Sequence, residues 1–338
     1  MEKIMRNDIK SLIIGNRLTQ SVLSALHFKE LSWLGWRIWF KYILFSKPYV
    51  PKNELIIEIS DTCNAKCSFC TTGIENRKKG GKKERKKFIE PDFFEKIVHY
   101  CKQQHFIQKD TNVCLINWGE PFLHPEFEKI IEISHREHLN IYLSSNASVF
   151  PKISKNFNAS CIKNMVFSMP GFSQASYNKI HQLNFEQVKS NISKIVETFR
   201  ISNPNIVFTL FFHIYRFNVP EIDAAYKFSK GLKMMFYPYF AFINDYEMHR
   251  DFLLKKSSPN DLELIKRFLF KKCEIPIKLI KTCPYCNRIL VNPDGECELC
   301  TIKRTKIGNI FEMTPEKLSK CFEESKICKE CMQLGLMN

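Results

Sequence analysis

The length, composition and charge of the chain exclude several classes of protein. It has 338 residues, of which 44% are apolar and 25% are charged, as in globular domains rather than fibrous or disordered chains. This length fits two domains, or one large domain with an appendage. No apolar run reaches the roughly 20 residues of a membrane span, and the N-terminus lacks the pattern of a secretory signal. We therefore expect a cytoplasmic protein with no transmembrane span.

Much of the net charge of +16 is concentrated in one place. Residues 77–87 read RKKGGKKERKK, with eight basic residues and one acidic residue. Such a run is typical of a solvated loop, although nucleic acid, an anionic membrane surface or an acidic protein would also attract it. No aromatic residue interleaves the run, as it would on a platform that stacks nucleic-acid bases. We expect a solvated loop at residues 75–87, and we do not expect nucleic acid as a partner.

Residues 1–52 are expected to form an N-terminal helical segment. Their apolar residues recur at spacings of three and four, which favours a helix. Residues 33–45 add three tryptophans and two cations. A helix at the membrane interface is therefore the alternative to a helix packed on the main domain. Pro48 and Pro51 mark the start of a new unit.

Between residues 53 and 245, short apolar runs alternate with amphipathic ones. The runs typical of strands are 55–59, 113–116, 141–143, 165–167, 206–212 and 234–237. The runs typical of helices are 91–107, 125–138, 150–157, 186–202 and 219–230. Repeated strand–helix units predict a parallel sheet with crossover helices. Periodicity alone leaves open a partial barrel or an open, doubly wound sheet.

The pattern changes after residue 245. Residues 247–272 have a charged, helical pattern, and eight cysteines lie between Cys273 and Cys331. We expect residues 246–338 to form a linker helix and a small second domain. Clustered cysteines in a reducing compartment more often bind metal than form disulfides, and so small a unit needs such a link to fold.

The first group of cysteines directly follows the first predicted strand. Residues 63–70 read CNAKCSFC, and parallel sheets carry their sites at the carboxyl ends of strands. Three cysteines do not complete a structural zinc site, which takes four ligands. They can ligate three irons of a [4Fe–4S] cluster and leave the fourth iron open. Cys63, Cys67 and Cys70 are therefore candidate cluster ligands.

This motif resembles the CxxxCxxC motif of the radical S-adenosylmethionine (SAM) superfamily, with Phe69 as the aromatic residue before the third cysteine. Asn218 follows the fifth predicted strand, as in many members. In the family's Gly-Glu motif, Trp118 replaces the first glycine. Three further segments resemble family motifs in the same order: INWGEPFLHP at 116–125, LSSNAS at 143–148 and FSMPGFSQASYNKI at 167–180.

The resemblance implies a fold, a cofactor and a reaction. The fold is a partial (βα)6, TIM-like barrel of the α/β class over residues 53–245. The amine and carboxylate of SAM chelate the open iron, and reductive cleavage of SAM gives a 5′-deoxyadenosyl radical that abstracts a hydrogen atom from the substrate. The resemblance further implies a set of SAM-binding residues: Phe69, Gly119, Glu120, Asn146 and Ser168.

The C-terminal cysteines form a second group. Residues 283–300 read CPYCNRILVNPDGECELC, which predicts a hairpin with its turn at Asn292–Gly295. The CxxC pairs suit either a zinc ribbon or an iron–sulfur cluster.

The spacing in this second group resembles the auxiliary-cluster module of the SPASM and Twitch groups of radical SAM enzymes. There, a cysteine, a glycine and a second cysteine open the module, and a later CxxC closes the cluster. The resemblance implies one auxiliary [4Fe–4S] cluster with four ligands: Cys283, Cys300, Cys328 and Cys331. Cys286, Cys297 and Cys321 are then spare thiols or ligands of a second, incomplete cluster.

A full auxiliary cluster favours a two-electron oxidation, because it can accept the electron left on the substrate radical. We expect a small or carbohydrate-like substrate and an electron donor such as flavodoxin or ferredoxin. A peptide-modifying SPASM-type maturase is the alternative; a non-enzymatic zinc- or nucleic-acid-binding protein would leave the first cysteine motif unexplained. Tyr237, Tyr239, Asn244 and Asp245 are candidate cavity residues, and no catalytic acid or base is assigned.

Overall fold

The computed structural model describes residues 54–78, 87–109, 111–270, 283 and 288–336. The predictions for the N-terminal segment and for most of the basic run lie outside the described residues. So do those for Cys273 and Cys286.

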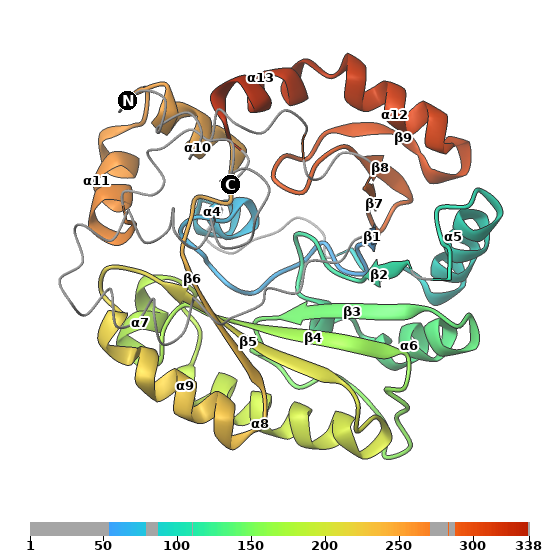
Figure 1. Cartoon of the computed structure of the whole chain (residues 1–338), viewed down its shortest axis with the longest axis horizontal. Helices are drawn as coiled ribbons and strands as arrows, with labels where there is room; N and C mark the ends of the chain where they lie inside the picture. Colours follow the sequence, from blue (N-terminus) through green and yellow to red (C-terminus); the bar gives the residue numbers. More distant parts are fainter. Residues whose placement is uncertain (1–53, 79–86, 110, 271–282, 284–287, 337–338) are drawn as a thin grey trace, which may run out of the picture.

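Six parallel strands, connected largely by helices, form the body of the molecule (Figure 1). They are β1 (Glu54–Ile57), β2 (Asn112–Cys114), β3 (Asn140–Ser145), β4 (Ile162–Met169), β5 (Val207–Ile214) and β6 (Met235–Phe240). The strands lie in the sheet in their order along the chain. A doubly wound sheet reverses its strand order at a switch point, so the observed order decides for the (βα)6 arrangement and confirms the predicted α/β class.

The helices of the body lie close to the predicted positions. They are α4 (Thr71–Lys78), α5 (Pro91–Gln103), η3 (Pro121–Leu123), α6 (Phe127–Arg136), α7 (Gln174–Lys179), α8 (Phe185–Ser202), η4 (Val219–Glu221), α9 (Ile222–Gly231), α10 (Tyr246–Leu253) and α11 (Pro259–Phe268). Local signals set several starts: Pro91 opens α5, and the side chain of Asn184 caps α8 by accepting from Gln187 N.

The helix predicted at 150–157 is absent, and that prediction is wrong. Ser154 donates from its backbone N–H and its hydroxyl to the Glu128 carboxylate, at 2.7 and 2.5 Å. The hydroxyl of Ser154 also accepts from Asn156 N. Side chains that bind the backbone in this way compete with helical hydrogen bonds, so the segment keeps an irregular path.

The C-terminal part continues the same sheet. Its elements are β7 (Ile289–Val291), β8 (Glu296–Glu298), β9 (Lys306–Asn309), η6 (Ile310–Glu312), α12 (Pro315–Glu324) and α13 (Lys326–Leu334). β7 pairs with β1 in parallel, and β8 and β9 follow in antiparallel order. The predicted hairpin is confirmed, with Gly295 at a positive φ of 78° in its turn. The division at residue 245 remains a prediction, because one sheet runs through both parts.

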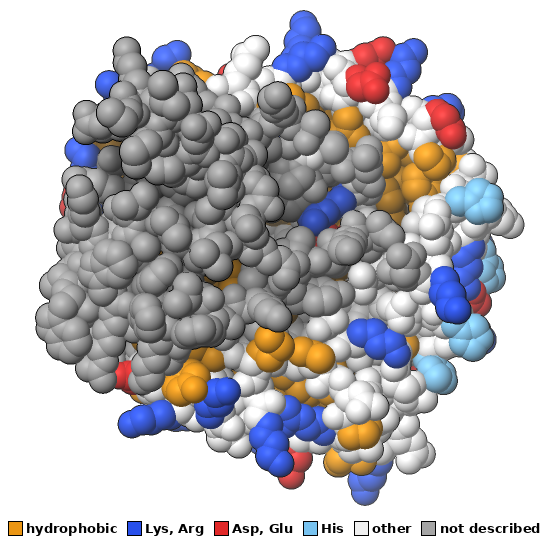
Figure 2. All heavy atoms as spheres, in the orientation of Figure 1, with side chains coloured by type: hydrophobic (Ala, Val, Ile, Leu, Met, Phe, Trp, Pro, Cys, Tyr) orange, Lys and Arg blue, Asp and Glu red, His pale blue; other side chains and the backbone are white. Residues whose placement is uncertain are grey.

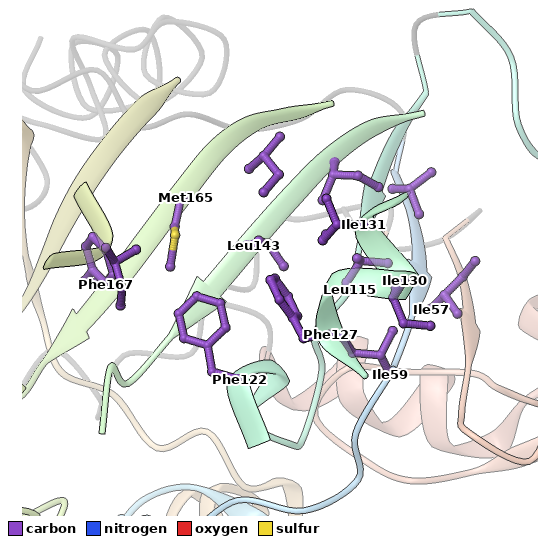
Figure 3. Packing of buried hydrophobic residues seen from close by; sticks show 14 of the residues in the cluster. Ile57, Ile59, Leu115, Phe122, Phe127, Ile130, Ile131, Leu143, Met165 and Phe167 are labelled. Carbon is purple, nitrogen blue, oxygen red and sulfur yellow. The ribbon is translucent and has the colours of Figure 1, made fainter. Parts of the chain in front are cut away.

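Alternation along the strands gives the sheet two faces. One face packs against the helices, as Figure 3 shows for Leu143 and Met165 beside Phe122 and Phe127. These two aromatic rings meet edge to face at 5.1 Å. The intervening residues of each strand lie on the other, inner face, where polar side chains are frequent.

No helix among the described residues is both long and apolar enough to cross a membrane. On the face seen in Figure 2, the described Lys and Arg side chains are scattered rather than gathered in a stripe.

Candidate functional site

The loop with Cys63, Cys67 and Cys70 joins β1 to α4, as the sequence predicts. Asn76 on α4 donates from Nδ2 to the carbonyls of Cys63 and Ala65, both at 2.8 Å. The backbone N–H groups at the start of α4 donate to the Cys70 sulfur. The loop is therefore folded back onto the helix that follows it, which brings the three thiols together.

Gly73 permits this close approach. A Cβ at this position would lie 2.3 Å from both the N and the O of Cys67. No other residue fits without displacing the cysteine loop.

Burial raises the pKa of all three thiols, to about 12 for Cys63, where the nearby Glu120 carboxylate adds to the effect. In Cys67 the charges of the two other cysteines add to the effect of burial. A bound metal reverses this balance, because it deprotonates its thiol ligands.

The three cysteine sulfurs are not arranged as the ligands of a single ion. Thiolates around one zinc ion lie about 3.8 Å apart, from the tetrahedral geometry and a Zn–S distance of about 2.3 Å. Within the described ranges, the one group of three ligand atoms mutually within 4.8 Å is Glu95, His99 and Glu137 on the surface. The three cysteine sulfurs are spread more widely than that.

Gly119 and Glu120 lie beside this loop, at the end of β2. A Cβ on Gly119 would lie 1.7 Å from the Ser60 carbonyl oxygen. Only glycine therefore allows the backbone at this position to pack so closely against Ser60. Glu120 N donates to Thr62 O at 2.8 Å. The Gly-Glu segment is thus tied to the strand end that carries the cysteines.

The carboxylate of Glu120 is buried and already has protein partners. It accepts from the Ser145 hydroxyl at 2.7 Å, from Asn146 N at 2.8 Å and from Phe122 N at 3.2 Å. Burial raises the pKa of Glu120 to about 7. The side chain therefore joins the ends of β2 and β3, a structural role that the sequence did not predict.

Asn146 reaches the cysteine loop from the end of β3. Its Nδ2 lies 3.6 Å from the Cys63 sulfur and 3.3 Å from Asn64 Oδ1. Ser168 lies partly buried on the inner face of β4. The Phe69 ring is buried and stacks on Tyr215 at 6.2 Å.

Asn218 serves the fold. Its Nδ2 donates to the carbonyls of Pro170 and His213, and its Oδ1 accepts from Tyr215 N, all at 2.8 Å. It makes no side-chain cap on the following helix. The residue thus fixes the ends of β4 and β5.

An aromatic wall lies on the inner face of β5 and β6. The hydroxyl of Tyr239 lies 2.6 Å from His213 Nε2, and Phe211 contacts the rings of Tyr237 and Tyr239. Burial lowers the pKa of His213 to about 4, so its imidazole is neutral at pH 7. The wall offers hydrogen bonds and ring faces without a formal charge.

Trp118 lies at a contact between the two parts of the chain. Its indole N–H donates to Glu298 of β8 at 3.3 Å, and Arg304 lies over its ring at 5.3 Å. Glu58, buried at the end of β1, accepts from Trp118 N at 2.6 Å and Gly119 N at 2.9 Å. Glu58, Glu298 and Arg304 were not among the predicted site residues, although an acid closing an apolar strand was a visible signal for Glu58.

The four cysteines predicted for the auxiliary cluster line one pocket. Its remaining walls are mostly apolar: Tyr246, Leu299, Phe322, Ile327 and Met332. The charges of Cys283, Cys300 and Cys328 each add to the burial that raises the pKa of Cys331 to about 12. Segments far apart in the sequence thus bring Cys283, Cys300, Cys328 and Cys331 together.

Two of the cysteines considered spare, Cys297 and Cys321, do not line this pocket. Cys297 is buried in the core on the helix-packed face of the sheet. Its electrostatic neighbours are Cys101 and Cys321.

The segment Asn244–Tyr246 connects the two groups of cysteines. Asn244 N donates to Phe69 O at 2.7 Å, and Asp245 Oδ2 accepts from the Thr71 hydroxyl at 2.8 Å. Tyr246 lines the C-terminal pocket and donates to Glu330 at 2.6 Å. Asn244 and Asp245, predicted as cavity residues, therefore bind the cysteine loop.

Comparisons with known proteins agree with this fold. Residues 57–227 match the model of the radical SAM superfamily. Streptococcus suis SuiB bound to its precursor peptide SuiA is similar at a TM-score of 0.53 and 13% identity, over 88% of this chain and 70% of that one. Native anSMEcpe with bound AdoMet gives 0.50 and 18% identity, over 83% of both chains. No curated protein gives a match. At these identities, the similarity to solved structures concerns the fold alone.

Proposed function

Since the chain belongs to the radical SAM superfamily, we propose that Cys63, Cys67 and Cys70 ligate the [4Fe–4S] cluster that binds SAM. The observation that carries the proposal is the meeting of three thiols with Gly119 and Asn146 at one edge of the parallel sheet. Three thiols can ligate three irons of a [4Fe–4S] cluster, whereas a structural zinc site takes four ligands. When bound, the cluster supplies the electron that cleaves SAM to methionine and a 5′-deoxyadenosyl radical.

The roles of the neighbouring residues follow from their contacts. Gly119 lets the Gly-Glu segment pack against the Ser60 carbonyl, which keeps this segment beside the cysteine loop, where the amine of SAM is expected to bind. Glu120 acts mainly by holding Asn146 at the end of β3. Asn146 and Ser168, both on the inner face, are the side chains proposed to bind SAM, and Phe69 contributes its backbone.

We further assign one auxiliary [4Fe–4S] cluster to Cys283, Cys300, Cys328 and Cys331. The walls of their pocket are mostly apolar, and apolar surroundings limit the access of solvent to a cluster. A ligand set of four thiolates leaves no iron open, so the role of this cluster is electron transfer.

The proposed reaction is a two-electron oxidation of a small, uncharged, carbohydrate-like molecule. The aromatic wall supports this substrate class, because the neutral His213 and the hydroxyls of Tyr237 and Tyr239 can hydrogen-bond to alcohols. The electron left on the substrate radical would pass to the auxiliary cluster, and flavodoxin or ferredoxin would supply the electron for SAM cleavage.

Peptide modification is the second candidate. The observation that favours it is the similarity in fold to SuiB, which was solved with the precursor peptide SuiA, and to anSMEcpe, which was solved with the Kp18Cys peptide. Incubating the reconstituted protein and SAM with peptides and, separately, with polyols distinguishes the two candidates by which compound is modified.

The test is anaerobic reconstitution with iron and sulfide, followed by dithionite and SAM. We expect about eight irons per chain, the content of two [4Fe–4S] clusters, and formation of 5′-deoxyadenosine. Replacement of the buried Cys161 by Ala is the matched control and should leave both results unchanged. A reconstituted protein that holds zinc, or that forms no 5′-deoxyadenosine, would contradict the proposal.

A further inference from the structure

Arg304 is a charged residue of the C-terminal part that reaches the first cysteine loop. It lies between β8 and β9. One guanidinium nitrogen, Nη2, donates to the Thr72 hydroxyl at 3.3 Å, and Thr72 is the second residue after Cys70. Through Arg304, the second part of the chain therefore contacts the start of α4.

The ring of Trp118 holds this guanidinium in place. The Arg304 carbon Cζ lies 5.3 Å from the ring centroid, within the range of a cation–π interaction. The indole N–H of Trp118 in turn donates to Glu298 on the neighbouring strand. The bulky residue at the position of the family's first glycine thus serves as a platform for an arginine from the other part of the chain.

The charges around Cys70 make the position of Arg304 significant. The Arg304 charge and the N–H groups of Thr72 and Gly73 favour a negative sulfur, whereas burial and the Asp245 carboxylate oppose it. Among the described residues, the carboxylates of Glu58 and Glu298 also interact with the guanidinium. Both are buried, and burial favours their neutral forms.

We infer that Arg304 is a positioning residue that raises the reduction potential of the SAM-binding cluster. Reduction adds one negative charge to the cluster, and a nearby fixed positive charge stabilises the product of that step. Net charge and hydrogen bonds around the sulfurs are the protein's means of setting such potentials. The inference rests on the proposed function, because it requires a cluster at Cys63, Cys67 and Cys70.

The test is an EPR-monitored redox titration of the reconstituted full-length protein. The SAM-binding cluster is identified as the one whose signal changes when SAM is added. We compare Arg304→Gln and Arg304→Met, which remove the charge, with Arg304→Lys, which keeps it. The matched control is Lys306→Gln, which removes a charge from the same module where the side chain pairs with Glu296 in solvent.

We expect a more negative midpoint potential in the Gln and Met variants. At a fixed potential, the ratio of reduced to oxidised cluster should fall about three- to tenfold, the effect of one partly screened charge. Arg304→Lys should retain most of the wild-type ratio, and Lys306→Gln should retain all of it. The second cluster should titrate unchanged in every variant.

Unchanged potentials in both neutral variants would overturn the inference, even if 5′-deoxyadenosine still forms and the proposed function stands. Cluster loss in the two neutral variants but not in Arg304→Lys would support the need for charge. Cluster loss in all three would make Arg304 a structural residue and would also overturn the inference. If the wild-type protein binds no cluster at the first three cysteines, the proposed function itself fails.

Discussion

The two groups of cysteines are built in opposite ways. Cys63, Cys67 and Cys70 lie within eight residues, on one loop between a strand and a helix. The four C-terminal cysteines span 49 residues, and separate segments carry Cys283, Cys300 and the pair on α13. A local loop holds the first group, whereas the second group exists only when the hairpin and the last helix have packed together.

The difference shows that one site can be held by contacts between residues close in sequence, whereas the other needs contacts between distant segments. The first group is held by contacts with its own helix, including Asn76 and Gly73. The second depends on pairing between β7 and β1 and on the contact of Tyr246 with Glu330. We therefore expect the second group to be the more sensitive to mutations far from it.

The largest expected effect is loss of the first group. Replacing Cys63, Cys67 and Cys70 together by Ala should abolish 5′-deoxyadenosine formation and remove about four irons per chain, one cluster's content. The remaining irons should stay, because the four C-terminal cysteines line a pocket to which the first three do not contribute. Iron analysis and product chromatography check both results. Continued SAM cleavage would refute the assignment.

The second prediction separates ligands from spare thiols in the C-terminal group. Cys283→Ala should lose about four irons, the content of the auxiliary cluster, and keep 5′-deoxyadenosine formation. Cys286→Ala and Cys297→Ala should lose none, and Cys297 lies in the apolar core. Iron loss from Cys286→Ala but not from Cys283→Ala would require a different ligand set.

The third prediction concerns the contact that joins β2 to the cysteine loop. Gly119→Ala places a Cβ within 1.7 Å of the Ser60 carbonyl, so the backbone must move. We expect a loss of about 1–3 kcal/mol or more in the free energy of unfolding and weaker SAM binding. Gly231→Ala is the control, since a Cβ there meets no atom within 4 Å, and it should be neutral or stabilising. Equal effects of the two substitutions would contradict the close-contact role.

The fourth prediction concerns the pH dependence due to Glu120, whose pKa burial raises to about 7. The folded protein holds this proton more tightly than the unfolded chain. Its contribution to stability is therefore full below pH 4.5 and is lost as the pH rises through 7. Glu120→Gln has no such proton to lose, so its free energy of unfolding lacks this dependence on pH. Between pH 4.5 and pH 7 the free energy of unfolding of the wild type should therefore fall relative to that of Glu120→Gln, by up to about 3 kcal/mol.

Denaturant unfolding at pH 5 and pH 7.5, under anaerobic conditions, measures this change. Glu132→Gln, at an exposed position on α6, should follow the wild-type profile. Parallel profiles for wild type and Glu120→Gln would show that the carboxyl group does not titrate as expected.

The smallest expected effect comes from an exposed link to the hairpin. Lys87 forms an ion pair with Asp294, and both side chains are 44% exposed. Lys87→Gln should cost at most about 1 kcal/mol and less at high salt. Arg288→Gln should cost more, because Arg288 pairs at 2.8 Å with Glu54, whose side chain is only 8% exposed. Comparing the two unfolding curves in low and high salt checks the ranking.

Much of the fold could be predicted because its signals are local. Pro91 starts a helix where its missing N–H costs nothing, and Asn292–Gly295 forms a turn because glycine tolerates a positive φ. The helix predicted at 150–157 is absent because this segment depends on a partner that is distant in sequence. The backbone N–H of Ser154 donates to Glu128, 26 residues away in sequence, and a local pattern does not record such a partner.

By itself, the sequence determined the strand–helix order, the positions of the three loop cysteines and the class of the fold. These properties depend on residues within a few positions of one another. Only the tertiary structure decided that Glu120 binds the end of β3 and that Arg304 lies on Trp118 beside the cysteine loop. Such contacts join residues that are distant in the chain, and only the pairing of strands into one sheet brings them within reach.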